Sequence, residues 1–337
     1  MANLKTIKER FIATMNSVAD YLDKEASDIK RDEYVRATVD NDVQGRLNKE
    51  ELNILGGYRV AKTMYFDEGD HGHTQPKVLI YDIETAPILG HVWGLWDNNL
   101  GLSQIENDWY ILSWSAKWLG SPEDEVMYMD QSKAKNIEDD GDLLDGIWEL
   151  LNEADIVITQ NGKKFDQKKL NARFIISGML PPSSYRHIDT LKIAKRVFGF
   201  TSNKLEYMTD KLCTKYKKLK HAKFAGFALW KECLAGNPEA WAEMELYNKY
   251  DVLSLEELYL IFAAWDNSIN FNTYHDDEET ICKCGSTDFK KSGFHYSNAG
   301  RYQKWKCKAC GHETRDTENL LDKVKRKNMR RDLSPSH

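Results

Sequence analysis

Apolar side chains near the beginning of the chain recur at the spacing of an α-helix. They are three or four residues apart, at Leu4, Ile7, Phe11, Met15, Val18 and Leu22. This periodicity predicts one amphipathic helix of about three heptads. We expect its apolar face to pack within its own domain, and a seam between two copies of the chain is the alternative.

Shorter helical patterns follow, and two adjacent glycines interrupt them. The patterns cover residues 31–38, 47–55 and 58–66, with Gly56 and Gly57 between the last two. Short helices joined by a tight glycine turn are typical of a helix-turn-helix, although a plain helical bundle explains them nearly as well. The sequence predicts an all-α, candidate DNA-binding domain over residues 1–66 and a polar linker over residues 67–76.

From residue 77 onward the pattern is that of a mixed α/β domain. The expected strands lie at residues 78–81, 88–96, 109–118, 126–129 and 156–158. The expected helices cover residues 143–151 and most of residues 165–265. Strands first, one more strand after a helix and then helices indicate an α/β fold, which we place at residues 77–270.

Five tryptophans in and beside these strands allow two interpretations. They are Trp93, Trp96, Trp109, Trp114 and Trp118. We expect them to pack in the core and on the surface of the sheet. A platform on which nucleic-acid bases stack is the alternative.

Composition excludes two classes of protein. The chain has 337 residues, of which 41% are apolar and 11% aromatic, more than a wholly disordered chain contains. Its longest apolar run, residues 258–265, is far shorter than the roughly 20 residues of a membrane-spanning helix. The first residues lead into a charged stretch, so we expect no secretory signal and no membrane association.

Charge is distributed unevenly along the chain. The net charge is -6, yet residues 281–337 contain 14 Lys and Arg against 6 Asp and Glu. Residues 192–223 contain 10 basic side chains and only two acids, Glu206 and Asp210. Basic blocks are usually solvated faces, but two of them favour a polyanionic partner more than the total charge suggests.

Three carboxylate motifs occur in the α/β region. Asp82 and Glu84 are two residues apart on an expected strand, so both side chains leave the same face. Two acids at the end of an apolar strand are costly unless a cation joins them, and a divalent metal is the simplest one. Asp-x-Glu by itself is a common spacing.

The second and third motifs are ambiguous when each is taken alone. Asn161 and Gly162 make a turn after a strand, Phe165 is expected to anchor the next helix in the core, and Asp166 lies in its first turn. There a carboxylate is favoured by the helix dipole, so a capping role explains Asp166 as well as a ligand role. Tyr247 and Asp251 are one turn apart on a helix that begins after Asn237.

In this order, the motifs resemble those of the ribonuclease H-like 3′–5′ exonucleases of the DEDD class, in the subclass with tyrosine in the third motif. The resemblance extends to the proofreading domains of family B DNA polymerases and to free-standing phage or bacterial proteins similar to them. It covers residues 77–265 and implies an RNase H-like mixed sheet with flanking helices. No polymerase region follows in this sequence.

The resemblance also implies a two-metal hydrolysis of phosphodiester bonds. Asp82 would bridge two Mg²⁺ or Mn²⁺ ions, Glu84 and Asp251 would complete one site, and Asp166 would hold the second ion through water. Tyr247 would position the attacking water. Asp189 is expected only to support these ligands or to cap a helix.

Candidate nucleic-acid contacts lie near the second motif and in the basic segment. They are Asn161, Lys163, Lys164, Phe165, Lys204 and Lys218. Backbone phosphates are the expected partners of the lysines. The other lysines of residues 192–223 are weaker candidates, and most of them are expected to be solvated.

Four cysteines near the end of the chain have the spacing of a zinc ribbon, which we place at residues 278–316. They are Cys282, Cys284, Cys307 and Cys310. Four thiolates predict one structural Zn²⁺, whereas two disulfides would need an oxidising compartment. Because the first knuckle is Cys-x-Cys rather than Cys-x-x-Cys, it is expected either to be strained or to recruit His295 or His312.

The other expectations concern the remaining thiols, the tail and the function. Cys213 and Cys233 are expected to be buried thiols, in keeping with a reducing bacterial or phage-infected cytoplasm. Residues 317–337 are expected to be a basic, flexible tail that, with the ribbon, clamps duplex or single-stranded nucleic acid. The sequence predicts a metal-dependent 3′–5′ exonuclease acting on DNA, with RNA as the second choice. A non-catalytic binding protein and a structure-specific endonuclease are the alternatives, and the oligomeric state stays open.

Overall fold

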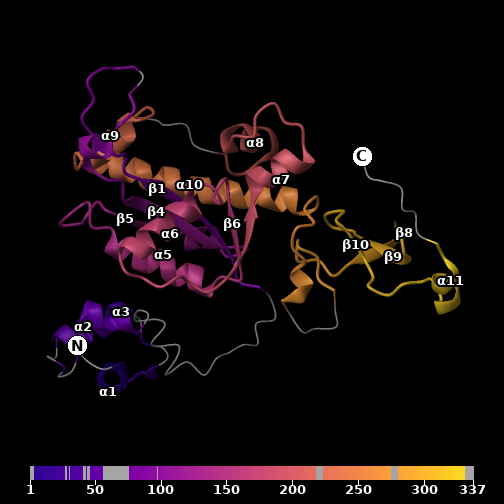
Figure 1. Cartoon of the computed structure of the whole chain (residues 1–337), viewed down its shortest axis with the longest axis horizontal. Coiled ribbons are helices and arrows are strands. Elements are labelled where there is room, and N and C mark those ends of the chain that lie inside the picture. The colour runs from indigo at the N-terminus through magenta and orange to yellow at the C-terminus, as the bar shows by residue number, and fades with distance from the viewer. Residues whose placement is uncertain are drawn as a thin grey trace.

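The structure is a computed structural model of the whole chain (Figure 1). It describes residues 4–26, 29, 31–40, 43, 46–55, 76–96, 98–217, 223–274 and 280–330. Two expected segments lie outside these ranges. They are the helix expected after the two glycines, at residues 58–66, and nearly all of the expected linker at residues 67–76.

A five-stranded mixed sheet forms the centre of the molecule (Figure 1). Its strands are β1 (Val78–Thr85), β4 (Ile111–Trp118), β5 (Met127–Asp130), β6 (Ile156–Thr159) and β7 (Arg186–Asp189). Their order is β5-β4-β1-β6-β7, antiparallel from β5 to β1 and parallel from β1 to β7. A small hairpin of β2 (Leu89–Gly90) and β3 (Ile105–Asn107) follows β1.

Helices cover both faces of this sheet. They are α5 (Gly141–Glu153), α6 (Asp166–Ile176), α7 (Thr190–Val197), α8 (Leu205–Leu212), α9 (Ala228–Leu234) and α10 (Pro238–Ala263). Because neighbouring side chains of β1 point to opposite faces, Leu79 and Tyr81 pack towards α5 and α6, whereas Val78 and Ile80 pack towards α10. Residues 82 and 84 therefore belong to the face that α10 covers.

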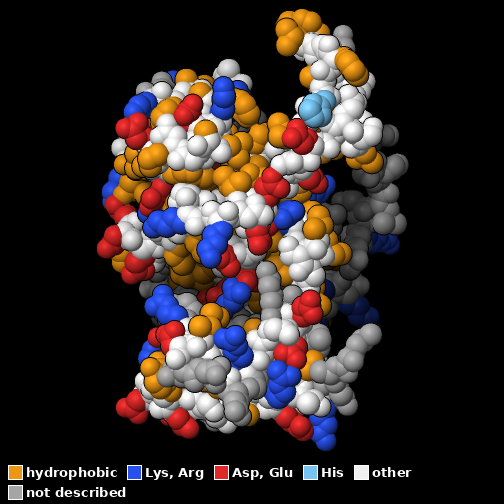
Figure 2. All heavy atoms as spheres, turned by 90° about the vertical axis from the view of Figure 1, so that its left-hand side faces the viewer, with side chains coloured by type: hydrophobic (Ala, Val, Ile, Leu, Met, Phe, Trp, Pro, Cys, Tyr) orange, Lys and Arg blue, Asp and Glu red, His pale blue; other side chains and the backbone are white. Residues whose placement is uncertain are grey.

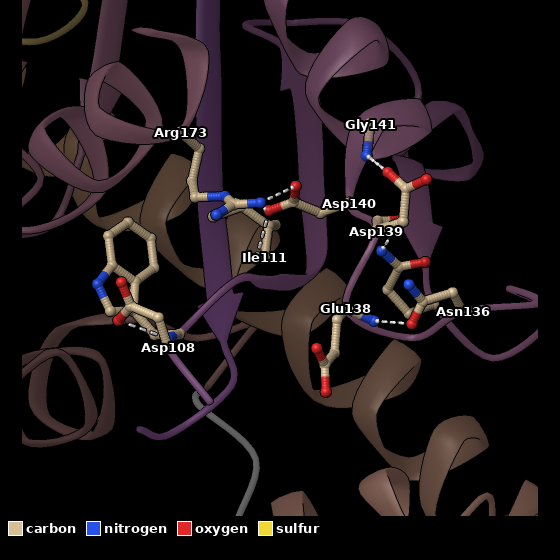
Figure 3. A network of polar contacts seen from close by, with 10 residues as sticks. Asp108, Ile111, Asn136, Glu138, Asp139, Asp140, Gly141 and Arg173 are labelled. Atoms are coloured by element: carbon tan, nitrogen blue, oxygen red, sulfur yellow. Dashed lines mark hydrogen bonds and ion pairs between the residues drawn. The ribbon is translucent and has the colours of Figure 1, made fainter. Parts of the chain in front are cut away.

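A buried ion pair attaches α6 to the sheet (Figure 3). Asp140, which is 1% exposed, accepts two hydrogen bonds from the guanidinium of Arg173 at 2.6 and 2.8 Å and one from the backbone N–H of Ile111 at 2.9 Å. The pair connects α6, the start of α5 and the start of β4. Breaking such a pair leaves an uncompensated buried charge and typically costs about 3–5 kcal/mol.

The N-terminal region is helical, as its sequence predicts. It contains α1 (Leu4–Leu22), α2 (Arg31–Asp40) and α3 (Lys49–Ile54). The apolar stripe of α1, including Phe11 and Met15, is buried against Tyr34, Leu47 and Leu55 of the same region. This stripe thus packs within its own domain, the interpretation that the sequence favours over a seam between copies.

The C-terminal region contains a three-stranded sheet of β8 (Phe289–Ser297), β9 (Gly300–Cys307) and β10 (Glu313–Arg315). The first two strands form the expected hairpin. In the tail, α11 (Lys323–Asn328) is a short basic helix where the sequence predicts flexible chain. Single turns of 3₁₀-helix lie at Leu102–Gln104, Glu123–Glu125 and Phe271–Thr273.

Three expectations about individual segments are wrong. Residues 88–96 contain only the two-residue strand β2, and the loop after it projects into solvent with apolar side chains at its tip (Figure 2). Trp93 and Trp96 are 100% and 86% exposed and do not pack as expected. Phe165 is 40% exposed and does not anchor α6 in the core. Leu170 and Phe174 are the apolar side chains that α6 buries there.

Strand β7 is absent from the sequence prediction. Its residues Arg186–Asp189 include only one fully apolar side chain, Ile188, which is too few for a recognisable strand pattern. Parallel pairing with β6, from Ile156↔Arg186 to Thr159↔Asp189, determines its position. Tertiary contact rather than local preference therefore creates this edge of the sheet.

Candidate active site

The first two predicted ligands lie where β1 extends beyond its parallel neighbour. Strand β6 pairs with β1 only from Val78 to Ile80, whereas the pairing with β4 continues past Asp82 and Glu84. The two carboxylates therefore lie beyond the end of the β1–β6 ladder, on the face covered by α10. Such points are where open α/β sheets leave room for a ligand.

Helix α10 supplies the third carboxylate. One oxygen each from Asp82, Glu84 and Asp251 lie within 4.8 Å of one another, although Asp251 is 166 or more residues away from β1 in the sequence. Asp251 is 3% exposed. Tyr247, one turn earlier, is 8% exposed and packs edge-on against Trp230, with ring centroids 6.3 Å apart. The structure thus brings together three of the four carboxylates that the sequence motifs single out.

Asn248 is a member of this site that the sequence analysis does not single out. Its Nδ2 donates a hydrogen bond of 2.8 Å to Oδ2 of Asp82, and its Oδ1 accepts one of 3.4 Å from Oγ of Ser113 on β4. The side chain is 0% exposed. Asn248 therefore fixes α10 against both β1 and β4 and orients the Asp82 carboxylate.

Asp166 contacts β1 through the backbone of the strand. Its Oδ1 accepts a hydrogen bond of 3.3 Å from the N–H of Ile83, and the side chain is 3% exposed. Burial, opposed by hydrogen bonds to backbone N–H groups and reinforced by the nearby Asp189, raises the pKa of Asp166 to about 7. Among the described residues, Asp166 is not part of the group within 4.8 Å.

The turn before α6 has an unusual backbone. Asn161 has a φ of +67°, a left-handed conformation that is uncommon for a residue with a side chain. Oδ1 of Asp189, which is 4% exposed, accepts hydrogen bonds from the N–H groups of Asn161 at 3.0 Å and Leu191 at 3.1 Å. Asp189 thus caps α7 and also holds this turn. Residue 162 has room only for glycine, because a Cβ at this position would lie 2.2 Å from Oγ1 of Thr159.

A groove of about 600 Å³ includes two of the carboxylates in its lining. Asp82 and Asp251 line it together with Asn161, Lys195 and Lys204. The groove therefore joins two of the predicted nucleic-acid contacts, Asn161 and Lys204, to the acidic cluster. Lys163, Lys164 and Phe165 are near it in sequence but are not among its lining residues, and Lys218 lies outside the described residues.

The carboxylate cluster fits a divalent cation of the hard class. Three carboxylates within 4.8 Å repel one another, and a cation removes that repulsion while satisfying their oxygens. Carboxylate oxygens are the ligands that Mg²⁺ and Mn²⁺ prefer. The residues able to hold such an ion are therefore Asp82, Glu84 and Asp251.

The four ribbon cysteines fit zinc equally well. The Sγ atoms of Cys282 and Cys310 are 3.5 Å apart, and those of Cys284 and Cys307 are 3.7 Å apart. A tetrahedral site with Zn–S bonds of about 2.3 Å separates its sulfurs by about 3.8 Å, whereas a disulfide requires about 2.05 Å. All six cysteines lie in the described part of the chain, and each is a free thiol.

The short Cys-x-Cys knuckle does not recruit a histidine. Nδ1 of His312 is 3.1 Å from the backbone oxygen of Ala264, and His295 packs against Tyr302 with ring centroids 6.3 Å apart. Burial opposes ionisation of Cys307, but hydrogen bonds from the N–H groups of Cys310 and Ala309 and from the thiols of Cys282 and Cys284 together lower the Cys307 pKa to about 6. The site is therefore a set of four sulfurs, with one thiol already poised to be a thiolate.

Comparison with known proteins identifies the class of the central domain. Residues 99–262 match the family model described as the RNase_H superfamily. The strand order and flanking helices agree with that match, so the chain contains an RNase H-like domain. The matched range begins after β1, and Asp82 and Glu84 precede it.

Comparisons with solved structures and with curated proteins say less about the chain than the family match does. A family B DNA polymerase from the hyperthermophilic archaeon Pyrobaculum calidifontis is 14% identical and has a TM-score of 0.39, with 59% of this chain and 26% of the polymerase covered. The chain thus spans about a quarter of that polymerase. No curated protein matches the sequence. Within the described residues, no helix combines the length and apolar character needed to cross a membrane.

Proposed function

We propose that the protein is a metal-dependent 3′–5′ exonuclease that hydrolyses phosphodiester bonds of DNA. The RNase H-like fold supports a nuclease in general. The single observation that carries the proposal further is the convergence of Asp82, Glu84 and Asp251 at the open end of the β1–β6 ladder. Direction and substrate come from the resemblance of the three motifs to the DEDD exonucleases.

In this proposal, Asp82, Glu84 and Asp251 would hold a Mg²⁺ or Mn²⁺ ion, and Asp166 would help to hold a second one. When bound, such ions lower the pKa of the attacking water and neutralise charge that develops on the phosphate. Asn248 keeps the Asp82 carboxylate oriented through its 2.8 Å hydrogen bond. Tyr247, fixed by Trp230, orients the attacking water with its hydroxyl group.

The groove of about 600 Å³ receives the substrate strand in this account. Lys195 and Lys204 are positioned along it to contact phosphates. The zinc ribbon has a structural role, since its four thiols fit a closed tetrahedral site. A reducing cytoplasm is the compartment proposed for these free thiols.

An assay with end-labelled nucleic acid tests the proposal. Linear DNA with a 5′ label should yield a ladder that shortens with time in Mg²⁺ or Mn²⁺, whereas a 3′ label should be released at once as a mononucleotide. Circular single-stranded DNA is the control and should stay intact. Matched RNA strands measure the preference for DNA.

Two outcomes would replace the proposal by its alternatives. Linearisation of the circular strand would establish an endonuclease. Binding of every strand without cleavage, in either metal, would establish a non-catalytic binding protein that uses the RNase H-like fold as a scaffold.

A further inference from the structure

The long hairpin of the zinc ribbon has one face with exposed aromatic rings. Side chains that pair across an antiparallel ladder lie on the same face, and the pairs here are Tyr296↔Arg301, Phe294↔Gln303 and Lys291↔Trp305. We call these six side chains the aromatic face. None of them belongs to the proposed active site.

Rings and cations alternate on the aromatic face. Tyr296 is 68% exposed and Phe294 is 44% exposed, with their ring centroids 6.5 Å apart. The guanidinium of Arg301 lies 5.2 Å from the ring centroid of Phe294, and Nζ of Lys291 lies 5.6 Å from that of Trp305. Solvent-exposed rings flanked by cations match the alternation of bases and phosphates in an unpaired nucleic-acid strand.

The charge of the surrounding region selects the kind of partner. The opposite face of the same sheet has four basic side chains, Lys290, Lys304, Lys306 and Arg315. Glu313 lies on this face too and forms an ion pair with Lys304. Residues 281–337 have a net charge of +8. An apolar protein groove would leave these cations without counter-charges, whereas a polyanion supplies them.

The aromatic face continues into a groove between the ribbon and the RNase H-like domain. This groove has a volume of about 790 Å³. Trp305 and Thr314 of the ribbon line it together with Asn267 and Asn270, which follow α10. Trp305 therefore joins the aromatic face to the space between the ribbon and the catalytic domain.

Polar contacts hold the ribbon at the end of α10. Asp266, which is 0% exposed, accepts a hydrogen bond of 2.6 Å from Arg196 and pairs with Lys283 of the first knuckle at 3.5 Å. The same lysine donates to the backbone oxygen of Asp266 at 2.7 Å. Asp251 lies on α10 about 18 Å before its end at Ala263, at 1.5 Å per residue. The aromatic face is thus attached to the helix that carries a predicted catalytic carboxylate.

We propose that the aromatic face binds single-stranded nucleic acid, with unpaired bases stacked on Tyr296 and Phe294 and phosphates contacted by Arg301 and Lys291. Paired bases in a duplex cannot offer their faces to these rings, so the surface prefers single strands. The proposal rests on the proposed function for the nature of the substrate. It adds a second binding point, distant from the carboxylates, that retains the strand during digestion.

Binding by the full-length, zinc-loaded chain tests this surface. In an Asp82→Asn background, anisotropy of a fluorescent oligothymidylate should show tighter binding than that of a duplex of equal length. Tyr296→Ala and Phe294→Ala should each weaken single-strand binding about 5- to 100-fold. Tyr296→Phe, which keeps the ring, and Ile175→Ala, which removes an exposed apolar side chain from α6, should bind as the parent does.

Salt dependence provides a second measurement on the same surface. Arg301→Gln and Lys291→Gln should each reduce the slope of log affinity against log salt by about 1. Unchanged affinity in both ring variants, or equal binding of duplex and single strand, would overturn the proposal. Zinc content of one ion per chain in each variant verifies that the ribbon is folded.

A small substrate separates this proposal from the nuclease proposal. A p-nitrophenyl ester of thymidine 5′-phosphate is too small to reach the ribbon from the carboxylates. With Asp82 intact, Tyr296→Ala should hydrolyse it at the parent rate while digesting long single strands more slowly. If neither protein hydrolyses the ester, the nuclease proposal fails and the binding results still decide the role of the aromatic face.

Discussion

The carboxylate cluster and the cysteine cluster are both suited to metals, but they differ in what holds their ligands in place. Asp82, Glu84 and Asp251 lie on a strand and a helix that two large apolar clusters already fix. Cys282 and Cys284 precede β8 in a short turn, and Cys307 ends β9, with little apolar core beneath them. The fold brings the carboxylates together despite their repulsion, whereas zinc would bring the cysteines together.

This difference gives metal removal opposite consequences at the two sites. Without a cation, the carboxylate cluster keeps its geometry and loses its chemistry. Without zinc, the ribbon loses its structure, because a region this small cannot bury enough apolar surface to fold.

The largest effect is expected from Cys307→Ser. Loss of one sulfur ligand should abolish zinc binding and unfold the ribbon, with a loss on the order of 10 kcal/mol of local stability. Limited proteolysis should then cut within residues 280–316 and leave the RNase H-like domain intact. Cys233→Ala, which changes a buried thiol outside the site, should retain one zinc per chain. A protease-resistant ribbon without zinc would refute the contrast.

Asp251→Asn should remove catalysis without unfolding the domain. The amide keeps the size of the side chain and lacks its charge, so turnover should fall at least about 1,000-fold, or about 4 kcal/mol. Asp124→Asn, an identical change at an exposed position, should leave turnover unaltered. The melting temperature of Asp251→Asn in EDTA should not fall below that of the parent, because the change relieves repulsion between carboxylates.

Asp166→Asn should stabilise the metal-free protein at high pH. The folded pKa of about 7 exceeds the ordinary value of 3.8, so the folded state keeps a proton that the unfolded state has released. Stability therefore falls as pH rises from about 4 to about 7, by up to about 4 kcal/mol. Urea unfolding in EDTA should show the variant more stable at pH 8 and equal to the parent at pH 4. An equal difference at both pH values would contradict the assigned cause.

The smallest effect is expected from Asn248→Leu. The change removes the hydrogen bond to Asp82 and leaves Oγ of Ser113 without its acceptor, at a cost of about 1–3 kcal/mol. Half-maximal activity should consequently require more Mn²⁺, since the Asp82 carboxylate is less well oriented. Asn152→Leu, which removes two hydrogen bonds accepted from Ser183 away from the site, should leave the Mn²⁺ requirement unchanged.

Local patterns predicted much of the fold because most core elements have regular burial. Strand β4 is buried at seven of its eight positions, and α5 buries the stripe that includes Leu143, Ile147 and Leu151. The cysteine site was predictable from spacing alone, since both knuckles are local. Strand β7 was not predictable, because pairing with β6 creates it. The exposed loop after β2 was not predictable either, because an apolar run in the sequence does not reveal whether other parts of the protein will bury it.

The carboxylate site was only partly predictable for the same physical reason. Sequence spacing reveals that Asp82 and Glu84 share a face, but it does not reveal which side chains of α10 point at β1. Helix α10 is buried on more than one side, so its pattern of apolar residues does not distinguish Asn248 from its neighbours. The three-dimensional contact with Asp82 is what gives Asn248 its role.

Titration of the zinc-loaded protein with Mn²⁺, with cleavage of single-stranded DNA followed in the same samples, tests the central claim most directly. The account predicts that two Mn²⁺ ions bind per chain, that cleavage appears as they bind, and that Asp82→Asn loses both while keeping its zinc. Cleavage in the absence of a divalent ion, or undiminished cleavage by Asp82→Asn, would contradict it.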